Sequence, residues 1–74
     1  LVTLGRLPES DVVVTDPGAS RQHARVANAN GVCVLTDRGS TNGTLVNDEE
    51  VHERMLEDGD RITIGETVLE FRRA

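Results

Sequence analysis

Aromatic residues are almost absent from this sequence, which contains one phenylalanine and neither tryptophan nor tyrosine. The chain therefore offers no platform on which nucleic-acid bases could stack, and no aromatic cage for a cationic ligand. Lysine is missing as well, so that every basic residue is an arginine. Without lysine the chain cannot contain the Gly-x-x-x-x-Gly-Lys-Ser/Thr loop that binds nucleotide phosphates.

Cysteine is nearly absent too, since Cys33 stands alone. A single cysteine excludes an internal disulfide, which is the usual covalent support of small secreted domains. One cysteine and two histidines, His23 and His52, also form a poor ligand set for structural zinc. We therefore expect no metal ion, a reducing cytoplasmic environment, and a small buried side chain at Cys33.

Long apolar runs are lacking, and no stretch approaches the roughly 18 apolar residues that cross a bilayer as a helix. We expect no membrane partner. The chain has 74 residues, which is enough for one small domain with a modest core. It begins with Leu1 rather than methionine, and we expect it to be an excerpt of a longer protein.

The net charge of −5 is unevenly distributed along the chain. Residues 1–43 contain as many arginines as acidic residues, whereas residues 44–74 contain four arginines and nine acidic residues. A general nucleic-acid binder would have a basic stripe instead. Arg38 and the acidic run at residues 48–50 are interpreted as solvated surface, and nucleic acid is not expected as a partner.

Short runs rich in valine, isoleucine and threonine alternate with turn residues, a pattern that predicts an all-β sandwich of short antiparallel strands. Asp48–Leu56 is predicted to be a loop or one helical turn, and Gly65-Glu66 to close a type II′ hairpin. Asn47 is interpreted as a turn former. The expected strands are Leu1–Leu4, Asp11–Thr15, Arg21–Val26, Val32–Thr36, Thr44–Val46, Arg61–Ile64 and Thr67–Phe71.

Polar residues gather in three of the predicted loops, and loops at one end of a sandwich converge in space. The three segments are Gly5-Arg6, Ser20 to His23 and Asp37 to Gly43. Their donors would together form an anion receptor with few competing carboxylates. These donors are the guanidinium groups of Arg6 and Arg21, the hydroxyls of Ser20, Ser40 and Thr41, and the amide of Asn42.

Such a receptor would bind an anion, but it contains no catalytic group. Ser20 and His23 would be a nucleophile pair with no identified carboxylate to orient the imidazole. The acidic turn Asp58-Gly59-Asp60 is too short for a calcium loop of the EF-hand type. We expect neither catalysis nor a cofactor.

These blocks resemble the forkhead-associated (FHA) domain, a β-sandwich that binds phosphothreonine peptides, and the resemblance extends over nearly all 74 residues. The lysine-free, valine-rich composition is similar to that of bacterial members, which suggests a bacterial multidomain protein. The blocks are Gly5-Arg6, Ser20-Arg21-Gln22-His23-Ala24, Asp37-Arg38-Gly39-Ser40-Thr41-Asn42-Gly43-Thr44, Val46-Asn47, and Leu56-Glu57-Asp58-Gly59-Asp60 followed by Ile62, Ile64 and Gly65.

The resemblance implies a role for each matching position. Arg6, Ser20, Arg21 and Thr41 match positions that contact the phosphate, and Asn42 matches the asparagine that holds the peptide backbone. Three further residues match positions that shape the site without touching the ligand, namely Gly5, His23 and Gly43. The implied partner is a protein phosphorylated on threonine by a Ser/Thr kinase, either a separate protein or another segment of the same one.

The chain departs from the family pattern in two places. One or two strands that usually precede the Gly-Arg pair are absent, so we expect an N-terminally truncated domain in which Thr67–Phe71 lies at an open sheet edge. Residues 16–19 contain no arginine to select the third residue after the phosphothreonine. Two alternative functions remain open at this point, a phosphate-independent interaction scaffold of the same fold and a binder of another anion such as a nucleotide.

Overall fold

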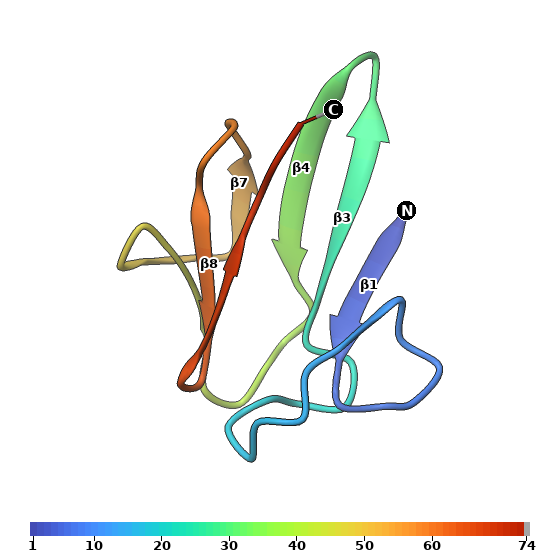
Figure 1. Ribbon diagram of the computed structural model, residues 1–74, viewed down its shortest axis with the longest axis vertical. Helices are drawn as coiled ribbons and strands as arrows, with labels where there is room; N and C mark the ends of the chain where they lie inside the picture. Colours follow the sequence, from blue (N-terminus) through green and yellow to red (C-terminus); the bar gives the residue numbers. More distant parts are fainter. Residues whose placement is uncertain (74) are drawn as a thin grey trace.

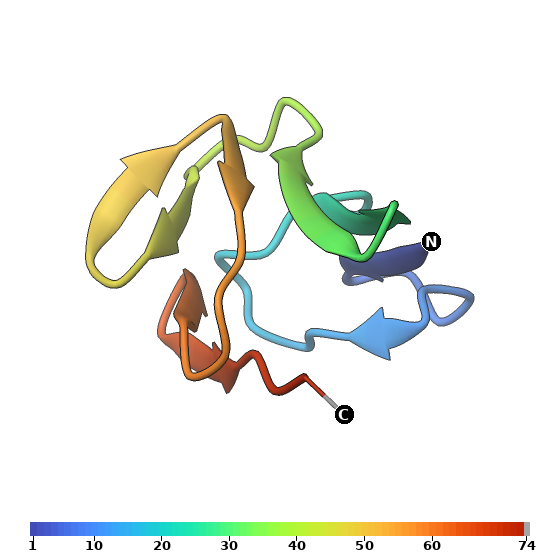
Figure 2. The same cartoon turned by 90° about the horizontal axis from the view of Figure 1, so that it is seen from above.

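Two β-sheets pack face to face in the computed structural model, which describes residues 1–73 (Figures 1 and 2). The predicted all-β sandwich is confirmed. The first sheet contains, in spatial order, β2 (Val12–Val13), β1 (Val2–Gly5), β3 (Ala24–Ala29), β4 (Val32–Asp37) and β7 (Glu53–Met55). The second sheet contains β6 (Glu49–Val51), β5 (Thr44–Val46), β8 (Arg61–Ile64) and β9 (Thr67–Glu70).

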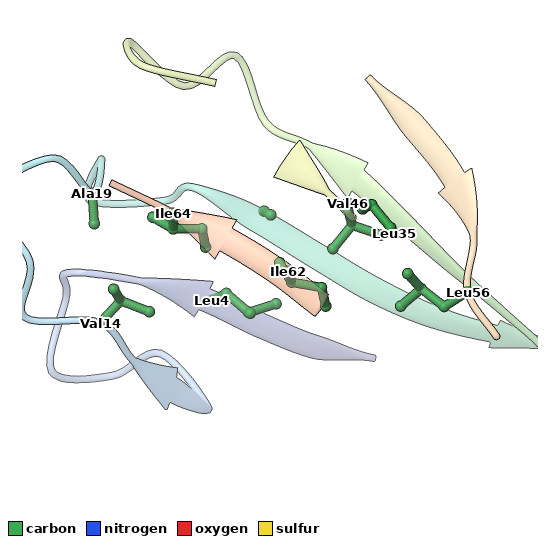
Figure 3. Close-up of a cluster of buried hydrophobic side chains, with 9 residues drawn as sticks. Leu4, Val14, Ala19, Leu35, Val46, Leu56, Ile62 and Ile64 are labelled. Atoms are coloured by element: carbon green, nitrogen blue, oxygen red, sulfur yellow. The ribbon is translucent and has the colours of Figure 1, made fainter. Parts of the chain in front are cut away.

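The core lies between the sheets and is built by strands with one apolar face, together with Val14, Ala19 and Leu56 from the connecting segments. In β8, for example, Ile62 and Ile64 are buried while Arg61 is exposed, as the period of two along a strand requires. Cys33 is only half-buried and packs against the edge of this core, so the expectation of a buried thiol is wrong. The buried apolar residues, all but Ala24 labelled in Figure 3, are Leu4, Val14, Ala19, Ala24, Leu35, Val46, Leu56, Ile62 and Ile64.

Three two-residue turns set the register of the hairpins. Asn30-Gly31 and Asn47-Asp48 have positive φ at both residues, as type I′ turns do, and Asn47 is a turn former as predicted. Gly65 has a φ of 62° and Glu66 does not have a positive φ, which agrees with the predicted type II′ turn between β8 and β9. Primed turns match the right-handed twist of the strands, so each hairpin closes without a longer loop.

Residues 48–56 contain two strands, and the prediction of a loop or helical turn there is wrong. β6 pairs with β5 in the second sheet, and β7 pairs with β4 in the first. The chain changes sheets at His52, whose carbonyl accepts a hydrogen bond from the Asp37 N–H at 2.8 Å. Both strands are edge strands with little buried surface, so their sequence is mostly charged and does not alternate between apolar and polar residues.

Two other details differ from the sequence prediction. Residues 21 and 22 form a bend, and β3 begins only at Ala24. The carbonyls of Arg21 and His23 accept the N–H groups of Leu7 and Arg38 in the neighbouring loops. β1 and β2 run parallel instead of antiparallel. The Asp11 carboxylate accepts hydrogen bonds from the N–H and hydroxyl of Thr3 at 2.9 and 3.1 Å. These bonds hold the residue that precedes β2 beside the first half of β1, so the two strands run in the same direction.

β9 lies at the edge of the second sheet, as expected for the last strand. Its Val68 side chain is 57% exposed. Beside β9, a mainly apolar hollow of about 260 Å³ opens between the sheets, lined among others by Val2, Val12 and Phe71. No helix in residues 1–73 is long and apolar enough to cross a membrane.

Candidate functional site

Loops from both halves of the chain gather at one end of the sandwich, the lower end in Figure 1. They are the segments after β1, before β3 and after β4, together with the turn between β8 and β9. The first three of these segments line an open hollow of about 530 Å³. Its lining includes four of the five contact residues implied by the sequence, which are Arg6, Ser20, Arg21 and Thr41.

Arg6 is held at the edge of this hollow by the loop that precedes β3. Its Nε donates to the carbonyl of Ala19 at 2.7 Å, and its backbone N–H donates to the carbonyl of Ser20 at 3.1 Å. Gly5 makes this contact possible, because a Cβ at Gly5 would overlap the carbonyl of Arg21. With Nε engaged, the Nη groups are the part of the guanidinium left to bind an anion, and their position is set before any ligand arrives.

His23 is fully buried and joins two of the loops. Its Nδ1 accepts the backbone N–H of Ser20 at 2.9 Å, so the ring proton must lie on Nε2, which donates to the carbonyl of Gly43 at 2.9 Å. Both ring nitrogens are therefore occupied by backbone groups. His23 shapes the loops and has no nitrogen free to take a proton from the Ser20 hydroxyl.

Ser20 lies at the junction of the same two loops. Its Oγ accepts the backbone N–H of Thr41 at 3.1 Å, which leaves the hydroxyl proton free to be donated. Ser20 and Thr41 both line the hollow, so this hydroxyl is available to an anion bound there.

Asp37 organises the loop between β4 and β5. One carboxylate oxygen accepts the N–H groups of Gly39 and Ser40, both at 2.8 Å, and the other accepts the hydroxyls of Ser40 and Thr44, both at 2.6 Å. Burial alone would raise the pKa of Asp37, but these hydrogen bonds outweigh it and the pKa lies below its usual value. Asp37 thus stays ionised and holds the loop in one conformation.

This arrangement corrects one part of the predicted receptor. The Ser40 hydroxyl donates to Asp37 and accepts the N–H of Gly43 at 3.0 Å, and Ser40 does not line the hollow. Both hydrogen-bonding functions of the hydroxyl serve the loop, so Ser40 is not available as an anion donor. The sequence showed the hydroxyl but not its partner.

Asn42 lies outside the lining of the hollow, on its exposed rim. Its Nδ2 donates to the carbonyl of Gly18 at 3.0 Å, which connects the loop after β4 to the loop before β3. The side-chain oxygen and the second N–H of this amide are available to an extended peptide that crosses the rim.

Asp16 is a structural residue that the sequence did not single out. Its carboxylate accepts the N–H groups of Gly18 and Glu66 at 2.7 and 2.9 Å, and these bonds lower its pKa. The hydroxyl of Thr67 also donates to it, at 3.1 Å. The Asp-Pro-Gly turn is visible in the sequence, whereas partners about 50 residues away in the chain are not.

The hollow is positively charged although the chain is acidic. Arg6, Arg21 and Arg38 all line it, no acidic residue does, and none of the three forms an ion pair with any residue of the described chain. Arg54, Arg61 and Arg72, from the acidic half of the chain, each pair with a carboxylate. Residues 1–73 contain no group of His, Cys, Asp and Glu side chains that could hold a metal ion. The geometry is suited to a polyatomic anion.

Comparison with known proteins identifies relatives of this fold and site. The family model described as the FHA domain matches residues 2–65. An oxoglutarate dehydrogenase inhibitor from Corynebacterium diphtheriae is 42% identical over 69 residues, which are 93% of this chain and 48% of that protein. This chain thus spans about half the length of the curated relatives that it matches first.

Solved structures agree with the family match. One structure comes from work described as a structural and functional analysis of phosphothreonine-dependent FHA domain interactions. It has a TM-score of 0.93 and 36% identity, over 99% of this chain and 76% of that one. EmbR from Mycobacterium tuberculosis, solved in complex with a low-affinity phosphopeptide, has a TM-score of 0.91 and 32% identity, over 96% of this chain and 19% of that one.

Proposed function

This chain belongs to the FHA domain family, and from that premise we propose that it binds partner proteins through a phosphorylated threonine. The observation that carries the proposal is the hollow lined by Arg6, Ser20, Arg21 and Thr41, in which cationic and hydroxyl donors face an acid-free space. Phosphothreonine has a charge of about −1.5 to −2 at neutral pH and three acceptor oxygens, so it complements these donors.

Each residue has a separate part in the proposed complex. The Nη groups of Arg6 bind phosphate oxygens as a charged fork, and the hydroxyls of Ser20 and Thr41 donate to the remaining oxygens. Arg21 adds a second positive charge at the rim. Asn42 binds the peptide backbone through the part of its amide that Gly18 leaves free.

The phosphate is bound in this proposal and is not transferred or hydrolysed. Hydrolysis would require a base near the ligand, and the one histidine at the site has both ring nitrogens occupied by backbone groups. We propose no catalytic activity and no cofactor for this domain.

The proposed partner is a protein phosphorylated by a Ser/Thr kinase, either a separate molecule or another segment of the same protein. Residues 1–74 would act as one binding domain, because both sheets share one core. The open edge of β9 and the apolar hollow beside it support a further strand of the parent protein at that edge.

Calorimetric titration with a degenerate phosphothreonine peptide library, beside phosphoserine and unphosphorylated libraries, tests this function. We expect binding to the phosphothreonine library alone. Arg6→Ala should weaken it by about 10- to 100-fold, which corresponds to losing a charged hydrogen bond of about 1.5–3 kcal/mol. Ser20→Ala should weaken it as well. Each variant also loses one hydrogen bond between loops, so a modest fall in the unfolding temperature is expected, and both should remain folded at the temperature of the titration.

Arg72→Ala serves as the matched control, since it removes the same charge at the opposite end of the molecule and should leave the affinity unchanged. Equal binding of phosphorylated and unphosphorylated peptides, or wild-type affinity in Arg6→Ala, would contradict the proposal. That outcome would favour a phosphate-independent scaffold of the same fold.

A further inference from the structure

Arg38 lies between two neighbouring hollows. It lines the hollow proposed for the phosphate, and it also lines a second one of about 370 Å³. Leu7 and Gln22 are shared in the same way, so the two hollows are adjacent. Arg38 is exposed, as the sequence suggested, and its side chain contributes to the lining of both hollows.

The second hollow extends from the loops onto the outer surface of the first sheet. Thr3 of β1 and Arg25 of β3 line it, and they are direct neighbours across the two strands. Arg25 forms no ion pair with any of residues 1–73. Glu9 is the one acidic residue in the lining.

The backbone holds Arg38 in place at this junction. Its N–H donates to the carbonyl of His23 at 2.9 Å, so it is fixed to the same buried residue that positions the Ser20 loop. The preceding residue, Asp37, is fixed by four hydrogen bonds. The backbone of Arg38 is therefore fixed, while its side chain is exposed.

The number of unpaired charges exceeds what one phosphothreonine needs. Arg6, Arg21 and Arg38 surround the first hollow without an acidic residue, whereas a phosphothreonine contributes at most about two negative charges. Arg25 adds a fourth unpaired arginine next to Arg38. The excess positive charge lies on the side of the second hollow.

From this arrangement we infer that Arg38 and Arg25 form a second anionic subsite, which binds an acidic group that flanks the phosphothreonine on the same peptide. The inference rests on the function proposed above and specifies its ligand. The acidic group is a carboxylate or a second phosphate, which share the ability to accept charged hydrogen bonds from arginine. Glu9 opposes it, since a carboxylate in the lining repels an incoming anion.

The experiment is a fluorescence anisotropy titration with a positional scan of synthetic peptides. Each peptide has one phosphothreonine in an alanine and serine background, with a single aspartate moved through the four positions on either side. A second arm replaces that aspartate with another phosphothreonine. We expect at least one position at which aspartate tightens binding about three- to tenfold, which is the range of an ion pair strengthened by charged hydrogen bonds. At the same position, a second phosphothreonine should tighten binding more than aspartate does.

Variants assign that gain to its residues. Arg38→Gln should reduce the gain to less than about twofold. The affinity of the same variant for the alanine-flanked peptide is its reference, so any loss of attraction for the phosphothreonine itself is divided out of the gain. Glu9→Gln should increase the gain. Arg72→Gln, which removes an equal charge at the far end of the sandwich, should change neither value.

The outcomes separate the two proposals. If the wild-type domain binds the alanine-flanked phosphopeptide but gains nothing from an acidic residue at any position, the second subsite is refuted and the phosphothreonine function stands. A gain that persists undiminished in Arg38→Gln also refutes the assignment. If no phosphothreonine peptide binds at all, both proposals fall together.

Discussion

The position of Arg6 depends on the absence of a side chain at the neighbouring Gly5. Gly5 is buried at the end of β1, where the segment of residues 21–23 passes directly over it. The backbone hydrogen bonds from Arg6 to Ser20 and from His23 to Leu4 require this close approach. The glycine is needed here for space, since its φ is not positive.

Gly5→Ala tests this requirement. The new methyl would overlap the Arg21 carbonyl, so the loop must move away and the core beside it must yield. We expect a loss of about 1–3 kcal/mol in the free energy of unfolding, as in other overpacked sites, together with weakened phosphopeptide binding. Urea denaturation and anisotropy on the same samples measure both effects.

Gly31→Ala is the comparison. A Cβ at Gly31 meets no atom within 4 Å, so this change costs only the strain of a side chain at positive φ, about 1 kcal/mol. It should leave binding unaffected because the turn lies at the opposite end of the sandwich. Equal stability and full binding in Gly5→Ala would show that the loop does not depend on the close contact.

At the scale of elements, carboxylates hold the binding loops together. Asp37 organises the loop between β4 and β5, and Asp16 joins the loop before β3 to the turn between β8 and β9. Both residues have a lowered pKa because they accept hydrogen bonds in the folded state. The loops are thereby ordered by contacts with one another and not only by local turn preferences.

Asp37→Asn should destabilise the domain by about 1–3 kcal/mol, because an amide group replaces an acceptor of two hydroxyls, one of them on the fully buried Thr44. The wild-type contribution should be complete near neutral pH. It should be lost as pH falls below the ordinary aspartate pKa of about 3.9 and through the lower value of the folded state. Urea unfolding at a series of pH values measures this.

The free energy of unfolding of Asp37→Asn should accordingly fall less between neutral pH and about pH 3 than that of the wild type does. Glu57→Gln is a suitable control, since Glu57 is exposed and its carboxylate makes no hydrogen bond or ion pair with any of residues 1–73. An unchanged acid dependence in Asp37→Asn would mean that Asp37 is not among the groups responsible for it.

The hairpin between β5 and β6 offers a stabilising change. Asp48 has a φ of 70°, in the second position of a type I′ turn where glycine is preferred. Its contact with Arg61, at 3.7 Å, is exposed and contributes little. Asp48→Gly should therefore raise the free energy of unfolding by about 0.5–1 kcal/mol, measured by urea denaturation, whereas Asn47→Ala in the same turn should lower it.

At the scale of the whole molecule, charge is separated along the fold. Three arginines of the second half of the chain pair with nearby carboxylates, while the unpaired arginines of the first half surround the binding end. The net charge of −5 is a property of the whole chain and does not describe the end of the molecule that faces the ligand. A phosphopeptide meets a positive end on an acidic molecule.

This separation predicts how binding depends on salt and pH. Affinity for a phosphothreonine peptide should fall several-fold as salt shortens the Debye length from about 10 Å at 0.1 M toward 3 Å at 1 M. It should also fall as pH drops through about 6, where the phosphate takes up its second proton and loses charge. Calorimetry across both series tests this, and an affinity indifferent to both would argue for an apolar interface.

The sequence alone determined the fold class, most strands and four of the residues that line the first hollow, namely Arg6, Ser20, Arg21 and Thr41. Local signals were sufficient there, because alternating apolar residues, primed turns and the Gly-Arg, Ser-x-x-His and Ser-Thr-Asn-Gly blocks each lie within a few neighbouring positions. The charged edge strands β6 and β7 escaped prediction because they bury too little surface to need an apolar pattern.

Tertiary structure alone decided what each polar side chain of the loops does. Ser40, Thr41 and Asn42 are adjacent in the chain, yet Ser40 bonds to Asp37, Thr41 lines the hollow and Asn42 reaches Gly18. The same holds for Arg38, which a local reading leaves in solvent and the fold puts between two hollows. A hydrogen bond depends on distance in space, and loops 20 to 50 residues apart in the chain come within reach only after the sheets have packed.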